Sequence, residues 1–236
     1  MKNVAVFGSG GAIGSALVLE LLKIFPEASV HAFSSSSAIN IPQVNSYVID
    51  YCDESQLQQH ASAFADSPLD LIFVATGVLH VGDVMPEKSL RDLSAEKFRV
   101  IYEANTITPS LIAKHFLPKL NKASKSLFAA LSARVGSVSD NRLGGWYSYR
   151  ASKAALNMVI KNLAIEIKRT NKHAVVVGLH PGTVASNLSK PFQHNVPTDK
   201  LFSAEFSANQ LLSVLNGLDL TDSGKLFAWD GQEVIP

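Results

Sequence analysis

The sequence contains a single cysteine, Cys52, so the chain has no second thiol for an internal disulfide. Absence of disulfides fits a reducing compartment, and we expect a cytoplasmic protein. The sequence also lacks an uninterrupted apolar run of about 18 residues, which a membrane-spanning helix would need. The N-terminus begins with a strand-like segment rather than a charged stretch followed by an apolar one, so no signal peptide is visible.

Neither sign of charge dominates, because 21 Lys and Arg stand against 20 Asp and Glu. No basic stripe stands out, so nucleic acid is not an expected partner. The histidines are scattered and lack the spacing of metal ligands, so no metal site is expected. No Ser-His-Asp order is visible either, which argues against hydrolase chemistry.

The chain has 236 residues, of which 47% are hydrophobic, enough for a substantial core. Apolar, β-branched runs recur at 3–8, 29–34, 45–50, 69–77, 126–132, 173–182 and 224–229. Segments with helical periodicity lie between them, at 12–25, 54–65, 95–120, 149–170 and 203–217. Strands that are apolar throughout and alternate with helices indicate a parallel sheet buried on both faces. We therefore predict one doubly wound (Rossmann) α/β domain over 1–236, with a seven-stranded parallel sheet between two helical layers.

A glycine-rich turn joins the first strand to the first helix in "VAVFGSGGAIGSALVLELL". Glycines remove the Cβ that would keep a phosphate from the backbone, and the helix that follows points its positive end at the same place. Gly8 can make the tight turn, Gly10 and Gly11 allow close approach, and Gly14 permits helix–strand contact. The turn predicts nucleotide binding; the alternative is a tight turn without a ligand.

Four serines, Ser34–Ser37, follow the second strand, about 20 residues beyond Gly14, where an acidic residue would bind the ribose of NAD. No carboxylate there would repel a 2′-phosphate, and no Lys or Arg would attract one. Hydroxyls can bond to either ribose, so the sequence favours NADP over NAD only weakly. The serines could equally form an ordinary polar loop.

In "YSYRASKAAL", Tyr149 precedes Lys153 by four residues, which puts both on one face of a helix. A free tyrosine titrates near 10, and a lysine cation one turn away should lower its pKa and make it a better acid–base group. By itself the pair could also be two surface residues that share a face.

The glycine turn and this pair together resemble the short-chain dehydrogenases/reductases, along nearly the whole chain. The stretch "GSVSDNRLGGWYSYRASKAALNM" looks closest to the sniffer-type carbonyl reductases and the C-factor-like branch. The resemblance implies an NAD(P)-dependent oxidoreductase that transfers a hydride between a nicotinamide cofactor and the carbonyl or alcohol group of a small molecule. It also implies a homodimer or homotetramer, paired through the helices that hold Asn105 and Tyr149.

The resemblance assigns residues to the cofactor. Ala12 stands where the family has the middle glycine of its turn, and only Gly77 remains of the family's Asn-Asn-Ala-Gly. Asp50 matches the acidic residue placed near the adenine. The full expected set is Gly8, Gly10, Gly11, Ala12, Ile13, Gly14, Ser34, Ser35, Asp50, Ala75, Thr76, Gly77, Tyr149, Lys153, Pro181, Gly182, Val184 and Ser186.

The expected catalytic residues are Asn105, Ser132, Tyr149 and Lys153. By resemblance, Lys153 also holds the nicotinamide ribose, and Asn105 anchors a water that links Lys153 to solvent. The family's serine lies three residues before a glycine, and counting back from Gly136 that position is Ala133. We therefore predict the neighbouring Ser132 as the donor to the substrate oxygen, with Ser137 as the alternative.

Residues 187–202 carry two prolines and several polar side chains and follow the Pro-Gly turn, so we expect a substrate flap there. Two other functions remain open. The altered Asn-Asn-Ala-Gly segment and the displaced serine would suit a cofactor-binding sensor or signalling protein with little turnover. A scaffold without a cofactor conflicts with the glycine turn.

Overall fold

A computed structural model describes residues 1–236, except the side chains of Asn195 and Thr198. Its main sheet has seven strands in the order β3-β2-β1-β4-β5-β6-β9, and every neighbouring pair is parallel. The strands are β1 (Asn3–Phe7), β2 (Ser29–Ser34), β3 (Val44–Val48), β4 (Leu71–Val74), β5 (Ser126–Leu131), β6 (Ala174–His180) and β9 (Leu226–Ala228). The predicted seven-stranded parallel sheet is confirmed.

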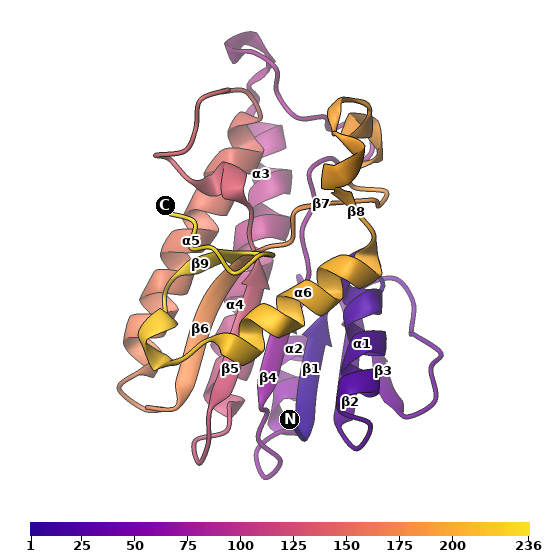
Figure 1. The fold of residues 1–236 in the computed structure, drawn as a ribbon, viewed down its shortest axis with the longest axis vertical. Helices are drawn as coiled ribbons and strands as arrows, with labels where there is room; N and C mark the ends of the chain where they lie inside the picture. The colour runs from indigo at the N-terminus through magenta and orange to yellow at the C-terminus, as the bar shows by residue number, and fades with distance from the viewer.

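Helices cover both faces of this sheet (Figure 1). On one face lie α1 (Ala12–Ile24) and α6 (Ala204–Gly217), and on the other α2 (Glu54–Ser62), α4 (Thr108–Phe116) and α5 (Tyr147–Ile167). Helix α3 (Ala95–Tyr102) continues into α4 and stands above the carboxyl ends of the strands. Short 3₁₀ segments are Leu90–Asp92, Leu117–Lys119, Arg134–Gly136, Lys190–Asn195, Thr198–Lys200 and Leu220–Asp222.

The apolar runs of the sequence reflect burial on both sides of the sheet. In β1, Ala5 and Phe7 pack towards α2, α4 and α5, whereas Val4 and Val6 pack towards α1 and α6. All four side chains are fully buried. Since successive side chains point to opposite faces, a strand covered on both faces has no polar position.

The segment predicted as one helix over 95–120 is interrupted. A π-helical segment, Glu103–Ile107, separates α3 from α4, and a 3₁₀ turn follows α4. A two-stranded parallel pair, β7 (Thr183–Val184) with β8 (Leu201–Phe202), was not predicted. Each of its strands has only two residues, too few for a hydrophobic period to mark them. None of the described helices is long and apolar enough to cross a membrane.

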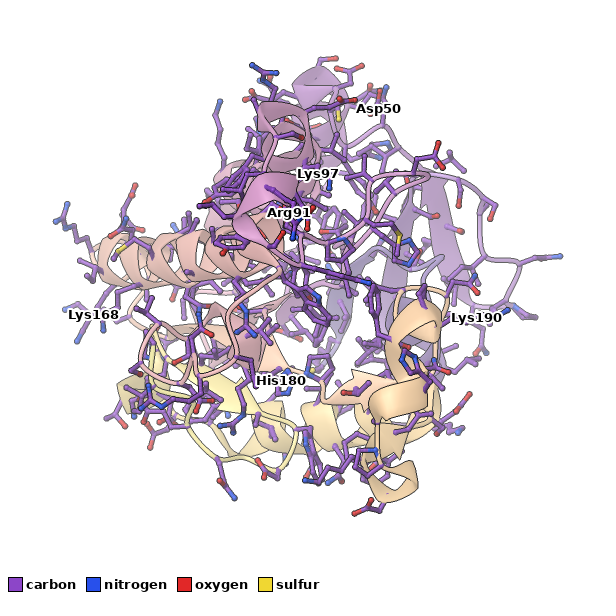
Figure 2. All side chains as sticks on the ribbon, turned by 90° about the horizontal axis from the view of Figure 1, so that it is seen from above. Asp50, Arg91, Lys97, Lys168, His180 and Lys190 are labelled. Carbon is purple, nitrogen blue, oxygen red and sulfur yellow. The ribbon has the colours of Figure 1, made fainter. Side chains whose placement is uncertain are left out.

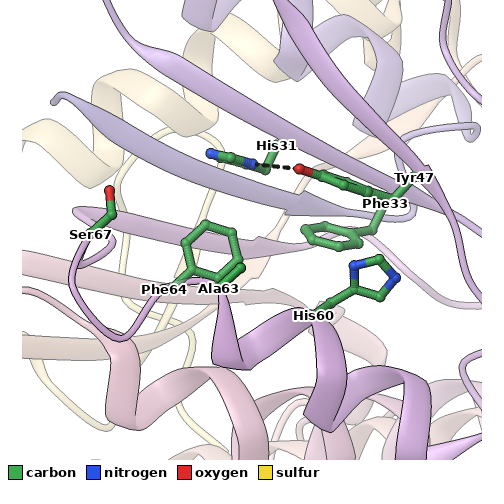
Figure 3. Close-up of a pocket in the computed structure, with 7 residues that line it drawn as sticks. All are labelled: His31, Phe33, Tyr47, His60, Ala63, Phe64 and Ser67. Carbon is green, nitrogen blue, oxygen red and sulfur yellow. Dashed lines mark hydrogen bonds between the residues drawn. The ribbon is translucent and has the colours of Figure 1, made fainter.

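A cavity of ≈ 110 Å³ lies between the β2–β3 edge of the sheet and α2 (Figure 3). The His31 ring stacks on Tyr47, with its Nδ1 3.3 Å from the Tyr47 hydroxyl, and meets the edge of Phe64. His60 meets the rings of Phe33 and Tyr47 edge-on. Burial among these rings lowers the pKa of both His31 and His60.

This cavity predicts a loss of stability in mild acid. A histidine whose pKa is lowered by folding binds its proton more readily in the unfolded chain, so the free energy of unfolding falls as pH drops below about 6.5. One such group changes it by at most about 1.4 kcal/mol per pH unit. In His31→Phe the melting temperature should fall less between pH 7.5 and pH 5.5 than in the native protein. His173, which is exposed, provides the matched control: an equal flattening in His173→Phe would contradict the assignment.

Candidate active site

The glycine turn after β1 presents free backbone donors. The N–H groups of Gly8 and Ser9 both donate to Phe33 O, and Gly11 N–H donates to Gly8 O. Four other N–H groups have no acceptor among the described residues. They belong to Gly10 in the turn and to Ala12, Ile13 and Gly14 at the start of α1. The first turn of α1 also carries no acidic residue. Such a cluster of donors at a helix N-terminus suits a phosphate group.

Close packing explains why glycines form this turn. A Cβ on Gly14 would lie 2.2 Å from Gly8 O, and one on Gly8, whose φ is +78°, would lie 2.8 Å from the carbonyl carbon of Ala75. A Cβ on Gly10 would lie 2.7 Å from Ser34 Oγ. The turn is therefore held between the ends of β2 and β4, and a phosphate can approach its backbone from the open side. Ala12 begins the helix, where the middle glycine of the family is not needed for space.

Tyr51, which the sequence analysis missed, supports this turn from below. Its hydroxyl accepts the Gly8 N–H at 2.8 Å and donates to Phe33 O at 2.8 Å. Burial raises the pKa of Tyr51 to about 12, so the hydroxyl keeps its proton. No sequence pattern separates this tyrosine from the others, because its partners are backbone atoms of two different strands.

The end of β2 offers hydroxyls without cations. Ser34 is buried against Gly10, whereas Ser35 is exposed. Asp50 is exposed as well, its Oδ1 accepts Cys52 N–H, and it lies at the periphery of the molecule seen from the carboxyl ends of the strands (Figure 2). The sequence has no Lys or Arg between Lys23 and Lys88, so a 2′-phosphate at Ser34 and Ser35 would be met by hydroxyls alone.

Lys153 lies at the centre of the group of residues predicted to be catalytic. It is buried in α5, and its Nζ donates to Leu131 O at the end of β5 at 2.8 Å. The same Nζ is 5.9 Å from the centre of the Tyr149 ring. A Cβ built on Gly77 would lie 3.3 Å from Nζ and 3.1 Å from Asn105 Oδ1. The structure thus brings Gly77, Asn105, Tyr149 and Lys153 together.

Asn105 is fully buried in the π-helical segment. Its Oδ1 accepts Val78 N–H at 2.8 Å, and its Nδ2 donates to Val78 O at 2.9 Å and to Ser152 Oγ at 3.1 Å. The Asn105 side chain therefore connects the loop after β4 to α5. π-Helical segments inside helices are frequent at functional sites, and here the segment turns Asn105 towards α5.

The pKa values differ from the prediction. Burial raises the pKa of Tyr149 to about 12 and lowers the pKa of Lys153 to about 7. We expected the lysine cation to lower the pKa of the tyrosine. In the structure, the low polarity around both groups disfavours their charged forms, and Lys153 points its ammonium at Leu131 O.

The buried side chain of Glu87 contacts the start of α5. Glu87 is fully buried; its Oε2 accepts Ser148 N–H at 3.2 Å and its main-chain O accepts Trp146 N–H at 2.6 Å. Trp146, the residue before α5, has a left-handed backbone (φ 49°, ψ 44°) and no side-chain cap. A carboxylate at a helix N-terminus satisfies free N–H groups and complements the helix dipole. Sequence reasoning missed Glu87, which lies 61 residues from its partner.

The predicted serine is not placed as expected. Ser132 is buried, and its Oγ donates to Asn157 Oδ1 at 2.6 Å. Asn157 lies two turns beyond Tyr149 on α5, about 12 Å along the axis, so Ser132 donates its proton away from Tyr149. The next residue, Ala133, has no hydroxyl. The alternative, Ser137, donates to the carbonyl of Ile235 near the C-terminus.

The Pro181-Gly182 turn follows β6. Gly182 has φ +76°, and a Cβ there would lie 2.5 Å from the Phe202 ring, so the turn packs directly on β8. Val184 is buried in β7, and Ser186 N–H donates to Ser189 Oγ at 3.2 Å. Before the turn, burial lowers the pKa of His180 to about 4, and its Nδ1 has no partner among the described residues. His180 lies well inside the outline in Figure 2.

The loop after β4 completes the site. Ala75 N–H donates to Phe7 O, which holds the loop beside the glycine turn. Thr76 Oγ1 is buried and has no partner among the described residues. Across all the residues that the structure describes, no group of three or more His, Cys, Asp or Glu side chains is arranged to hold a metal ion.

Comparison with known proteins identifies the family. The family model described as short chain dehydrogenase matches residues 2–197. The chain belongs to this family. It is therefore an NAD(P)-dependent oxidoreductase, as the sequence predicted.

The relatives agree with the predicted branch. The chain is 29% identical over 178 residues to C-signal of Myxococcus xanthus, covering 75% of this chain and 99% of that protein. It is 31% identical over 185 residues to 1-hydroxy-2-glutathionyl-2-methyl-3-butene dehydrogenase of Rhodococcus sp., covering 78% and 76%. The structure of carbonyl reductase Sniffer of D. melanogaster superposes with a TM-score of 0.85 at 19% identity, covering both chains completely. An NADPH-bound carbonyl reductase from chicken fatty liver gives 0.86 at 23% identity, covering 100% and 94%.

The position of Ser132 predicts a structural effect of its removal. Ser132→Ala breaks the hydrogen bond to Asn157 and should lower the free energy of unfolding by about 1 kcal/mol. Its kcat should change less than about tenfold, whereas loss of a hydrogen-bond donor to the transition state costs about 100- to 1,000-fold. Asn157→Ala, which removes the other partner, should behave alike. A kcat lowered 100-fold in Ser132→Ala alone, measured by steady-state kinetics, would reinstate Ser132 as the donor to the substrate.

Proposed function

We propose that this protein reduces the carbonyl group of a small molecule, or oxidises the corresponding alcohol, with Tyr149 as the proton donor or acceptor. The observation that carries the proposal is the cluster of Tyr149, Lys153, Asn105 and Gly77 at the carboxyl ends of β4 and β5, in which Lys153 and Asn105 are buried. Ligands of doubly wound sheets bind at this edge.

The fit of a nicotinamide cofactor rests on the glycine turn. The free N–H groups at the start of α1 would hold its pyrophosphate, Ser34 and Ser35 its adenine-side ribose, and Asp50 would lie near the adenine. Ala75, Thr76 and Gly77 would line its middle portion, while Val184 and Ser186 would meet the carboxamide. We propose NADP rather than NAD, since no carboxylate stands at Ser34–Ser37 to repel a 2′-phosphate.

Each residue of the site would contribute a different part of the reaction. A bound nicotinamide cofactor supplies or accepts the hydride. Tyr149, neutral at pH 7 because its pKa is about 12, can give its hydroxyl proton to the substrate oxygen as negative charge develops there. Lys153 would hold the nicotinamide ribose of a bound cofactor, and a protonated Lys153 would stabilise the phenolate left on Tyr149. Asn105 keeps the loop after β4 against α5 and, as the resemblance implies, would anchor a water that connects Lys153 to solvent.

Residues 187–202 are proposed as the substrate flap. The two ends of this segment are held together, because β7 pairs with β8 in a separate two-stranded sheet and Ser189 Oγ donates to Val184 O. Between these anchors the chain forms 3₁₀ turns above the carboxyl ends of the strands (Figure 1). A segment anchored at both ends can cover and uncover a site without losing its place.

A homodimer or homotetramer is proposed from the surface of α5. Met158 and Ile165 are 62% and 53% exposed on this helix, and Ile107 beside it is 42% exposed. An apolar stripe of this kind on one helix marks an interaction surface.

Replacing Tyr149 by Phe tests the enzymatic role. Tyr149→Phe should lower kcat by at least about 100-fold, because general acid–base catalysis contributes about 10²–10⁴-fold. Its affinity for NADPH, measured by calorimetric titration, should stay close to that of the native protein. Parallel titration with NADH tests the NADP preference. A native protein that binds NADPH tightly but turns over no carbonyl of a broad panel would instead be a cofactor sensor.

The pKa of Tyr149 predicts the pH dependence of the two directions. Alcohol oxidation needs the phenolate, so its kcat/KM should rise about tenfold per pH unit between pH 7 and 10, below the pKa of about 12. Carbonyl reduction needs the protonated hydroxyl and should show no such rise. A plateau of the oxidation rate from pH 8 upwards would mean that Lys153 lowers the pKa of Tyr149, as first predicted from the sequence.

A further inference from the structure

Three rings from three different loops form a chain of contacts that begins at Tyr149. Trp146, at the end of the loop before α5, meets the Tyr149 ring edge-on with centroids 6.1 Å apart. Phe192, in the 3₁₀ turn of the flap, meets Trp146 edge-on at 5.2 Å. His80, in the loop after β4, lies 6.2 Å from Phe192 on the other side. We call Trp146 and Phe192 together the aromatic wall.

The position of Trp146 is enforced by its neighbours. Its left-handed backbone is uncommon for a residue with a bulky side chain and costs conformational energy. The hydrogen bond from its N–H to Glu87 O maintains that conformation. Arg150 donates to the carbonyl oxygens of Gly144 and Gly145 just before it. Non-glycine residues held in such a conformation cluster at functional sites, where the strain positions a side chain.

The polar groups next to the wall are only partly engaged, because Glu87 Oε1 and His80 Nε2 are buried with no partner among the described residues. Glu87 Oε2 accepts the Ser148 N–H, and the Arg150 guanidinium donates to the main-chain carbonyls of Gly144, Gly145 and Val135. The wall itself offers aromatic ring surface next to Tyr149 through Trp146, which meets the Tyr149 ring and also packs against Phe192.

We propose that the substrates of this site carry a planar aromatic ring on or next to the reacting carbonyl, and that Trp146 and Phe192 select them. The proposal rests on the proposed function, because the substrate oxygen must lie within hydrogen-bond distance of the Tyr149 hydroxyl. A group attached to that carbonyl lies within one ring length of Tyr149, where the wall begins.

The wall distinguishes an aromatic ring from a saturated one of similar size. Both bury apolar area, but only the aromatic ring has the flat shape and charge distribution that favour edge-to-face and offset contacts. Such contacts contribute beyond burial by an amount that corresponds to about 2- to 10-fold in affinity or kcat/KM. Phe192 belongs to the flap, so the aromatic contact also couples substrate binding to flap closure.

The test compares benzaldehyde with cyclohexanecarbaldehyde as substrates, with NADPH as the reductant. The native protein should show a kcat/KM at least about threefold higher for benzaldehyde. Phe192→Leu should bring the ratio close to one, while Trp146→Phe, which keeps a ring, should retain most of it. Phe25→Leu removes a half-buried ring at the far end of α1 and should leave the ratio unchanged. Circular dichroism verifies that each variant is folded.

A binding measurement separates this proposal from the proposed function. Benzyl alcohol and cyclohexylmethanol are titrated calorimetrically into the NADPH-loaded protein, where neither can react. Tighter binding of benzyl alcohol that is lost in Phe192→Leu supports the wall even if neither aldehyde is reduced, an outcome that would overturn the proposed function alone. Equal binding of the two alcohols, equal kcat/KM for the two aldehydes, or an unchanged ratio in Phe192→Leu would overturn the aromatic wall.

Discussion

The hydrogen bond from Lys153 Nζ to Leu131 O is the contact on which the site depends. It joins α5 to the end of the central strand β5 and fixes the direction in which the Lys153 side chain points. Gly136 makes this approach possible, since a Cβ there would lie 2.8 Å from the main chain of Lys153. Asn105 then fastens the loop after β4 to the same helix through Val78 and Ser152. Tyr149 is placed by these contacts, one turn before Lys153.

The same contacts give the site its chemical character at a cost to stability. Burial that lowers the pKa of Lys153 to about 7 also means that the unfolded chain binds a proton there which the folded chain gives up between pH 7 and 10.5. This residue therefore destabilises the fold most in acid and less as pH rises. Glu87 adds a second buried ionisable group at the start of α5. Offsetting contributions come from the sheet, whose central strands are covered on both faces.

The residues of the site come from two kinds of element, strand ends with helices on one side and loops on the other. The rigid part, comprising the glycine turn, Asn105, Tyr149 and Lys153, lies on strand ends and helices. The part that would distinguish substrates lies on the loops that supply His80, Trp146 and Phe192. Ala133 and the Ser132–Asn157 hydrogen bond mark one place where the site departs from the pattern of the family, as Ala12 and the altered Asn-Asn-Ala-Gly segment do elsewhere.

Local sequence patterns determined the seven strands, the layer of helices on each face, the glycine turn and the Tyr149/Lys153 pair, because each depends on neighbouring residues and a short period. The resemblance to the family supplied Asn105 and Gly77. Tertiary structure alone decided the rest. Ser132 faces Asn157, Tyr51 supports Gly8, Glu87 holds the start of α5, and Trp146 meets Phe192. These contacts join residues from 25 to 61 positions apart, or bring separate loops together, and no periodicity in the chain encodes which side chains meet there. The raised pKa of Tyr149 belongs to the same class, since it comes from burial by the whole fold and not from the lysine one turn away.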